Sequence, residues 1–149
     1  MNRREFIGRG CGTCLGAVAL GTGLAGCAAT RYAATTLTRD GLQLSLQEFL
    51  IEGSARPAYR PFVVVRHEAL RFPICVFRFS NTEYAALWMQ CAHQGAELQA
   101  TDAALQCPAH GSEFDRRGQV TNGPAAAPLR SFPVTVSARE LFLDLRATA

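Results

Sequence analysis

Two short stretches of the sequence hold side chains that bind transition metals. The first contains Cys91 and His93, separated by one residue, and the second contains Cys107 and His110, separated by two. Thiolate and imidazole ligands in two separate loops indicate a metal site. Structural zinc sites usually pair cysteine with cysteine and histidine with histidine at short spacings, whereas each stretch here pairs a cysteine with a histidine. Because a Cys-x-His spacing is also tight for two ligands of one ion, the pattern favours two metal ions, one bound by both thiolates and the other by both imidazoles.

The residues around these ligands resemble a known family. The first pair continues into Gln94-Gly95, and the second continues into Gly111-Ser112 and then Phe114-Asp115. Together these stretches resemble the two cluster-binding loops of the Rieske [2Fe–2S] family. The Gly-Pro-x-x-x-Pro-Leu pattern at 123–129 is similar to the proline loop that covers the cluster in that family. The resemblance extends over about residues 60–146.

The resemblance implies a fold, a cofactor and a role for each site residue. The fold would be a small all-β domain of antiparallel sheets, with a cluster-binding subdomain inserted at about residues 91–130. It would hold one [2Fe–2S] cluster per chain. Cys91 and Cys107 would bind the inner iron, and His93 and His110 would bind the outer iron, near solvent and facing a redox partner. Ser112 would donate a hydrogen bond to a bridging sulfide of the cluster.

Three positions depart from the quinol-oxidising members of the family. Those members join their cluster loops by a disulfide, and the corresponding positions here hold Ala96 and Ala109. Their second hydrogen-bond donor, a tyrosine hydroxyl, is replaced by Phe114, which has no donor. Exchange of two thiolates for two neutral imidazoles raises the potential of such a cluster from about −400 mV to between about −150 and +300 mV. With one of two donors missing, we expect a potential below the quinol-oxidising class but above the bottom of this range.

Alternating and β-branched apolar runs predict that the chain from Arg31 onward is all-β. Leu42, Leu44 and Leu46 alternate with polar residues, and Asp40-Gly41 predicts a two-residue hairpin turn before them. Further strands are expected at 62–65, 73–79, 84–89, 132–136 and 141–145, and a turn at 80–82 joins the second and third of these. Residues 91–130 are rich in glycine and proline, which predicts a loop-rich region around the ligands.

The first 30 residues have the features of a targeting segment, and we expect the folded domain to span 31–149. Arg3-Arg4 is followed by an apolar pair and then by a charge-free, glycine-rich run at 10–30, which resembles a twin-arginine export signal. Within that run, Leu-Ala-Gly-Cys27 resembles a bacterial lipoprotein signal, so Cys27 would carry the lipid. An uncleaved membrane-spanning helix and ordinary cleavage remain alternatives. All three alternatives place the domain on the periplasmic side of the cytoplasmic or outer membrane.

Composition and motifs exclude several classes of function. The formal net charge of +3 is too small to indicate a nucleic-acid-binding protein. The sequence contains no Ser-His-Asp pattern, no carboxylate pair and no phosphate-binding loop to nominate as an active site. We therefore expect an electron carrier or a non-catalytic iron–sulfur subunit of a larger oxidoreductase, with a cytochrome-like protein or an oxidoreductase large subunit as redox partner. A lipoprotein with a structural zinc site is the alternative.

Other reactive or charged residues outside the ligand set have mainly structural interpretations. His67 is expected to be a surface or hydrogen-bonded structural residue, and Cys75 a small buried side chain within a strand. Arg116-Arg117 follows the second ligand loop and is either a solvated turn or a guide for an acidic partner.

Overall fold

The computed structural model describes residues 30–147, and Arg3, Arg4 and Cys27 lie outside the described residues. The described chain forms three β-sheets and one short 3₁₀ helix, η1 (Leu46–Phe49), which confirms the predicted all-β fold. In this part of the chain, no helix is long and apolar enough to cross a membrane.

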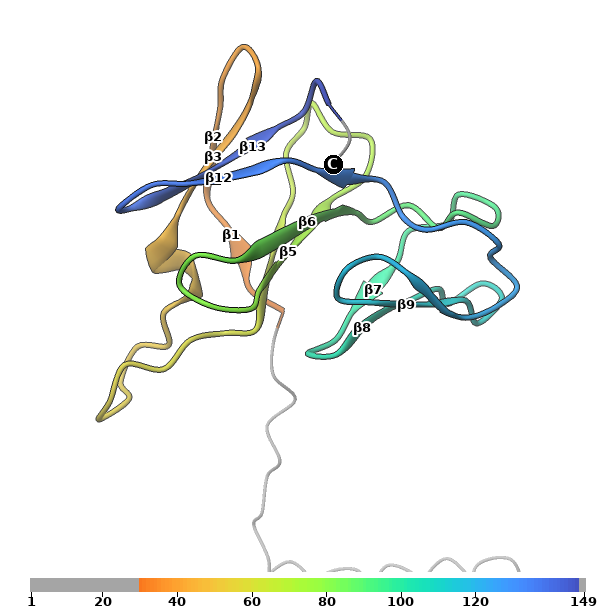
Figure 1. Cartoon of the computed structure of the whole chain (residues 1–149), viewed down its shortest axis with the longest axis horizontal. Coiled ribbons are helices and arrows are strands. Elements are labelled where there is room, and N and C mark those ends of the chain that lie inside the picture. Colours follow the sequence, from red (N-terminus) through yellow and green to blue (C-terminus); the bar gives the residue numbers. More distant parts are fainter. Residues whose placement is uncertain (1–29, 148–149) are drawn as a thin grey trace, which may run out of the picture.

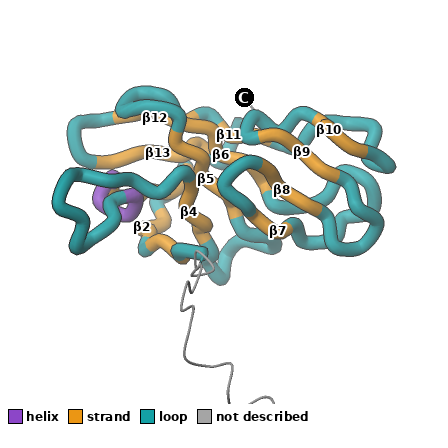
Figure 2. The backbone as a smooth tube through the Cα atoms, turned by 90° about the horizontal axis from the view of Figure 1, so that it is seen from below, coloured by secondary structure: helices purple, strands orange, loops and turns teal. Residues whose placement is uncertain are grey.

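The first sheet lies between the other two (Figures 1 and 2). Its strand order is β1 (Tyr32–Ala33), β4 (Phe62–Val65), β5 (Ile74–Arg78), β6 (Tyr84–Trp88) and β11 (Ser131–Phe132). The second sheet has the order β12 (Val134–Val136), β13 (Glu140–Asp144), β3 (Gly41–Ser45) and β2 (Thr35–Leu37). The third sheet has the order β10 (Val120–Asn122), β9 (Glu113–Asp115), β8 (Ala104–Gln106) and β7 (Gln99–Ala100). All pairings are antiparallel except that of β1 with β4, which is parallel.

The first sheet is buried on both faces, which explains why β4 is apolar without alternation. Successive side chains of a strand point to opposite faces. Accordingly, Val63 and Val65 pack toward the second sheet, whereas Phe62 and Val64 pack toward the third. Two hydrophobic cores result, one on each face of the first sheet. The core between the first and third sheets reaches into the loop-rich region that holds the predicted ligands.

The predicted hairpins are present, and one turn lies one residue earlier than expected. β2 and β3 pair with Leu37 opposite Leu42, and the N–H of Thr38 donates to the carbonyl of Gly41 at 2.8 Å. The turn residues are therefore Arg39-Asp40 rather than Asp40-Gly41. Gly41 instead belongs to β3, where a Cβ atom would lie only 1.9 Å from the carbonyl oxygen of Leu143. The close approach of the neighbouring strand thus explains this glycine, and the turn does not.

The strand predicted at 132–136 is two strands in two different sheets. β11 pairs with β6 in the first sheet, and β12 pairs with β13 in the second. Pro133 lies between them and has no N–H to donate, so a continuous ladder is interrupted there. Its carbonyl accepts a hydrogen bond from Asp144 N–H at 3.0 Å, which starts the pairing with the second sheet.

Candidate metal-cluster site

The two ligand-bearing loops, 91–96 and 107–112, extend from the strands of the first and third sheets. The β5–β6 hairpin delivers the chain to Cys91, as the sequence predicted. Within the first loop, Gly95 N–H donates to the carbonyl of Cys91 at 2.9 Å, and Cys91 N–H donates to the carbonyl of Ala96 at 2.8 Å. These two bonds fold the loop back on its own cysteine.

The second loop repeats the same backbone frame. Gly111 N–H donates to the carbonyl of Cys107 at 3.0 Å, and Cys107 N–H donates to the carbonyl of Ser112 at 2.8 Å. Both loop glycines have positive φ, +73° for Gly95 and +77° for Gly111, a conformation that side chains with a Cβ rarely adopt. The side-chain amide of Asn122 also donates to the carbonyl of Gly111 at 2.9 Å and ties the loop to β10.

The two histidines project from this shared frame at different positions. His93 is the second residue after its cysteine, and His110 is the third after its own. Both side chains are exposed, and their rings lie edge to face with centres 5.0 Å apart and planes at 87°. The structure therefore brings both imidazoles to the same exposed edge.

The two cysteines lie below that edge, in the core between the first and third sheets. Each is only 3% exposed. Burial acts to raise the pKa of the Cys107 thiol, but hydrogen bonds from the backbone N–H groups of Ala109 and His110 oppose it. The neighbouring Cys91 thiol acts in the same direction as those N–H groups, and the pKa of Cys107 is lowered overall. The two thiols thus face each other in a site that favours a thiolate.

Ser112 is fully buried beside the cysteines. Its hydroxyl oxygen accepts a hydrogen bond from Ala125 N–H at 3.0 Å, which joins the second loop to the 123–129 segment. A hydroxyl group also has one hydrogen to donate. Among the described residues, no protein atom accepts that hydrogen. A buried O–H without a protein acceptor fits a site that is completed by a non-protein acceptor.

Arg116 and Arg117 lie in a turn, as one interpretation of the sequence expected, and Arg117 is exposed there while Arg116 is half-buried. The guanidinium of Arg116 donates to the carbonyl of Arg78 and lies 4.6 Å from the ring centre of Phe79. Arg117 lies 4.4 Å from the same ring and pairs with Glu83. Because these partners belong to the β5–β6 hairpin and its turn, the arginines attach the third sheet to the first.

The remaining candidates behave as structural residues. His67 accepts a hydrogen bond from Ala69 N–H at 3.1 Å through its Nδ1 atom, as expected for a hydrogen-bonded structural residue. Cys75 is fully buried in β5, and burial raises the pKa of its thiol well above the ordinary value, although the charge of Arg116 opposes this shift. Neither residue is part of the ligand set.

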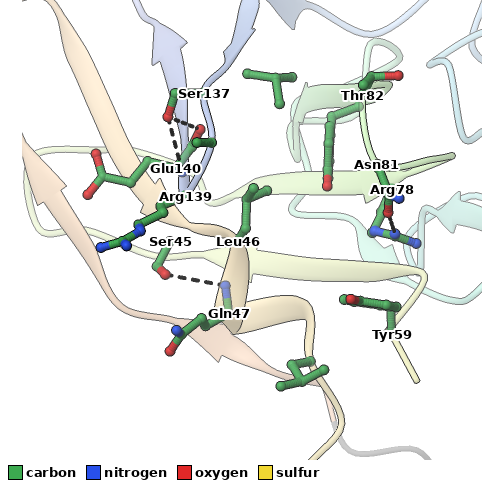
Figure 3. Close-up of a pocket in the computed structure, with 14 residues that line it drawn as sticks. Ser45, Leu46, Gln47, Tyr59, Arg78, Asn81, Thr82, Ser137, Arg139 and Glu140 are labelled. Atoms are coloured by element: carbon green, nitrogen blue, oxygen red, sulfur yellow. Dashed lines mark hydrogen bonds between the residues drawn. The ribbon is translucent and has the colours of Figure 1, made fainter. Parts of the chain in front are cut away.

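Two hollows of the surface were not predicted from the sequence. A groove of about 610 Å³ lies beside the first ligand loop and is lined by Trp88, Gln90, His93 and Arg130 among others. A wider hollow of about 1210 Å³ lies at the ends of the β5–β6 and β12–β13 hairpins, and Figure 3 shows that its lining includes Tyr59, Arg78 and Arg139. The wider hollow is lined by no cysteine or histidine, so size alone does not identify the redox site.

Comparisons with known proteins identify the family of this domain. The family model of the Rieske [2Fe–2S] domain matches residues 58–133, and the chain belongs to this family. The 3-phenylpropionate/cinnamic acid dioxygenase ferredoxin subunit of Escherichia coli (strain K12) is 31% identical over 86 residues, which are 52% of this chain and 81% of that protein. The corresponding subunit of Shigella boydii serotype 4 (strain Sb227) has the same identity and coverage. These relatives are ferredoxins, which are electron-transfer proteins.

Solved structures with similar folds were also found. The plasma membrane Rieske protein PetC3 from Synechocystis PCC 6803 is 24% identical, with a TM-score of 0.49 over 56% of this chain and 86% of that chain. The Sphingomonas yanoikuyae B1 ferredoxin is 25% identical, with a TM-score of 0.45 over 56% of this chain and 84% of that chain.

A Rieske domain holds one [2Fe–2S] cluster, and the residues present here fit that group. Two buried thiols neighbour each other, two exposed imidazoles lie edge to face, and a buried hydroxyl has a hydrogen to donate. Membership of the family favours this two-iron cofactor over the zinc site that the sequence left as the alternative.

Proposed function

We propose that this protein transfers single electrons through a [2Fe–2S] cluster held by Cys91, His93, Cys107 and His110. The observation that most directly supports the proposal is the separation of the ligands by depth. Both thiols are buried in the core, and both imidazoles are exposed at one edge. Such a site shields the sulfur ligands from water and presents the histidine edge to a redox partner.

Each ligand has a distinct role in this proposal. Cys91 and Cys107 would bind the inner iron, and the backbone N–H groups of Ala109 and His110 would stabilise charge on the Cys107 sulfur. The imidazoles of His93 and His110 would bind the outer iron and provide the exit for the electron. The bound cluster supplies one-electron chemistry at a potential that neutral imidazoles raise above that of an all-cysteine cluster.

The hydrogen bonds around the site set its expected potential. Ser112 supplies one donor, and Phe114, which is fully buried in the same core, supplies none. We therefore expect a potential below that of the quinol-oxidising class and above the bottom of the Rieske range. A redox titration that reaches the top of that range would contradict this expectation.

The domain would act as a carrier or as the iron–sulfur subunit of a larger oxidoreductase. The relatives named as ferredoxin subunits of a dioxygenase support an oxidoreductase partner. Among residues 30–147, no group of three or more His, Cys, Asp or Glu side chains is placed to hold a single ion. In either role the domain would pass electrons, and the partner would carry out any substrate chemistry.

Low-temperature EPR of the dithionite-reduced holoprotein tests the ligand assignment. A rhombic spectrum with the low mean g value of mixed histidine and cysteine ligation is expected, and His93→Gln or His110→Gln should abolish it. His67→Gln is the matched control, because it removes the third histidine of the chain without touching the loops. An unchanged spectrum in either ligand variant, or a colourless protein that contains zinc, would refute the assignment.

The domain is further proposed to be exported and held at the periplasmic side of a membrane. The Arg3-Arg4 pattern and the charge-free run that ends near Cys27 support this part of the proposal. Arg3→Lys combined with Arg4→Lys should retain the cluster-loaded protein in the cytoplasm, whereas Arg9→Lys, the matched control, should not. Cys27→Ala should leave export intact and release the domain from the membrane. Export of the Arg3→Lys, Arg4→Lys double variant at the wild-type level would contradict the proposal.

A further inference from the structure

The three loops around the two histidines bear no charged side chain. The exposed residues of the loops 91–96, 107–112 and 121–128 are small, apolar or amide side chains together with the histidines. They include Ala92, Gln94, Pro108, Ala109, Asn122, Pro124, Ala126, Ala127 and Pro128. These three loops form the tip of the domain around the histidines. A partner that approaches this tip therefore has contact area but no fixed charge to orient it.

The orienting charge lies in the groove on the His93 side of the tip. This groove, of about 610 Å³, is lined by His93, Trp88 and Arg130 among others. Trp88 is fixed by a hydrogen bond from its indole N–H to the side-chain oxygen of Gln90 at 3.0 Å. The ring of Phe72 packs edge-on against Trp88 with centres 6.1 Å apart. The groove wall is thus rigid and aromatic.

Arg130 is the charged residue of the groove lining, and the lining contains no carboxylate. Its guanidinium lies 4.7 Å from the ring centre of Phe132 and 5.9 Å from that of Trp88. Its one hydrogen bond, at 3.3 Å, goes to the carbonyl of Leu145, and it has no ion pair within residues 30–147. An arginine has five N–H donors in a planar fork, so most of them remain available to a carboxylate.

Carboxylates of the elements next to the groove are already neutralised. Glu97, whose backbone pairs with that of Gln90, is bound by Arg66. Asp144, next to the residue that accepts the bond from Arg130, is bound by Arg146 at 2.8 Å. The uncompensated charge of the groove is therefore positive, whereas the carboxylate nearest the second ligand loop, Glu113, is hydrogen-bonded by Gln106 without an ion pair.

We propose that this groove docks a redox-partner protein that places an aspartate or glutamate of its own surface against Arg130, beside its own cofactor. This inference rests on the proposed electron-transfer function and names the partner's chemistry. The uncharged tip would pack against the partner around the histidines, while the ion pair fixes the approach. Because the guanidinium is already held by two rings and a carbonyl, little side-chain freedom is lost when the ion pair forms.

The test compares electron transfer from the reduced holoprotein to oxidants of opposite charge. Cytochrome c with its lysine-ringed haem edge and the same cytochrome after succinylation, which converts those amines to carboxylates, form a matched pair. A change in the cluster's own potential shifts both rates in the same direction, whereas a change in surface charge moves them apart. The ratio of the two rate constants therefore reports the effect of the groove's charge on docking.

Arg130→Gln should lower the rate with the succinylated cytochrome, relative to the native one, by about two- to fivefold at low ionic strength. The effect should vanish at high salt, because exposed charges are screened there. Arg139→Gln is the matched control: it removes the same charge from the far hollow of Figure 3 and should leave the ratio unchanged. Arg130→Glu should reverse the preference.

Two results would overturn the inference. Equal ratios in wild type and Arg130→Gln would mean that the groove does not orient the partner. An equal loss in Arg130→Gln and Arg139→Gln would mean that only net charge matters. In both cases an unchanged Rieske EPR spectrum leaves the proposed function intact, whereas absence of that spectrum in the wild-type protein is a failure of the function itself.

Discussion

Replacement of Ser112 by alanine separates two effects of one buried hydroxyl. The oxygen accepts a bond from Ala125 N–H at 3.0 Å, and its hydrogen is free for a cluster sulfide. The reduced cluster carries one more negative charge than the oxidised one, so loss of a donor destabilises the reduced form and lowers the potential. A hydrogen bond to a charged group is worth about 1.5–3 kcal/mol, of which only the difference between redox states counts. If that difference is about half, roughly 0.75–1.5 kcal/mol, the one-electron potential falls by about 30–65 mV.

The same substitution also leaves a buried N–H group without an acceptor. Ala125 is only 6% exposed, and an unsatisfied buried donor costs about 1–3 kcal/mol. We expect Ser112→Ala to lower both the EPR-monitored potential and the stability of the holoprotein in urea. Asn122→Ala is the matched control, because it removes the bond at 2.9 Å to Gly111 in the same loop without removing a buried donor. A wild-type potential in Ser112→Ala would show that the hydroxyl only anchors Ala125, and the assignment of Ser112 to the cofactor would be wrong.

Two further predictions concern the side chains behind the site. Arg116→Met should lower the free energy of unfolding in urea by about 1–2 kcal/mol, because the bond to Arg78 and the contact with Phe79 are lost. Arg117→Met removes an exposed ion pair and should lower it by less than about 1 kcal/mol, so equal losses in the two variants would contradict the reasoning. Because the pKa of Cys75 is raised by burial, its thiol stays protonated at pH 8 and should resist iodoacetamide in the folded holoprotein, as mass spectrometry can show; alkylation as fast as in urea would refute this expectation.

The parts of the fold that the sequence predicts are those that depend on local pattern. The alternation of Leu42 and Leu44 and the apolar run at 62–65 indicate strands because burial follows the period of a single chain segment. The parallel pairing of β1 with β4 was not predicted, because two residues at 32–33 contain no period and their partners lie some thirty positions away. The break at Pro133 was also missed, because two strands that continue the same pattern can still belong to two sheets.

The site shows the same division between local and long-range information. Spacing alone predicted the four ligands, because metal chemistry restricts which residue types occur together. The role of Arg116 depends on how the third sheet docks onto the β5–β6 hairpin, and that arrangement has no local pattern. Arg130 is a single arginine after Leu129 in the sequence, and only the folded chain places it beside Trp88 and His93.

One property of the site follows from strand alternation. Leu87, Met89 and Cys91 are buried while the residues between them are less so. Leu105 within β8 and Cys107 just after it show the same inward phase. Each cysteine thus lies just past the end of a strand, β6 or β8, at a position that continues the inward phase of that strand. Each histidine comes after the chain has left the ladder, where nothing directs its side chain inward. Burial of the thiols and exposure of the imidazoles therefore have one cause, the point at which the strand pattern ends relative to the ligands.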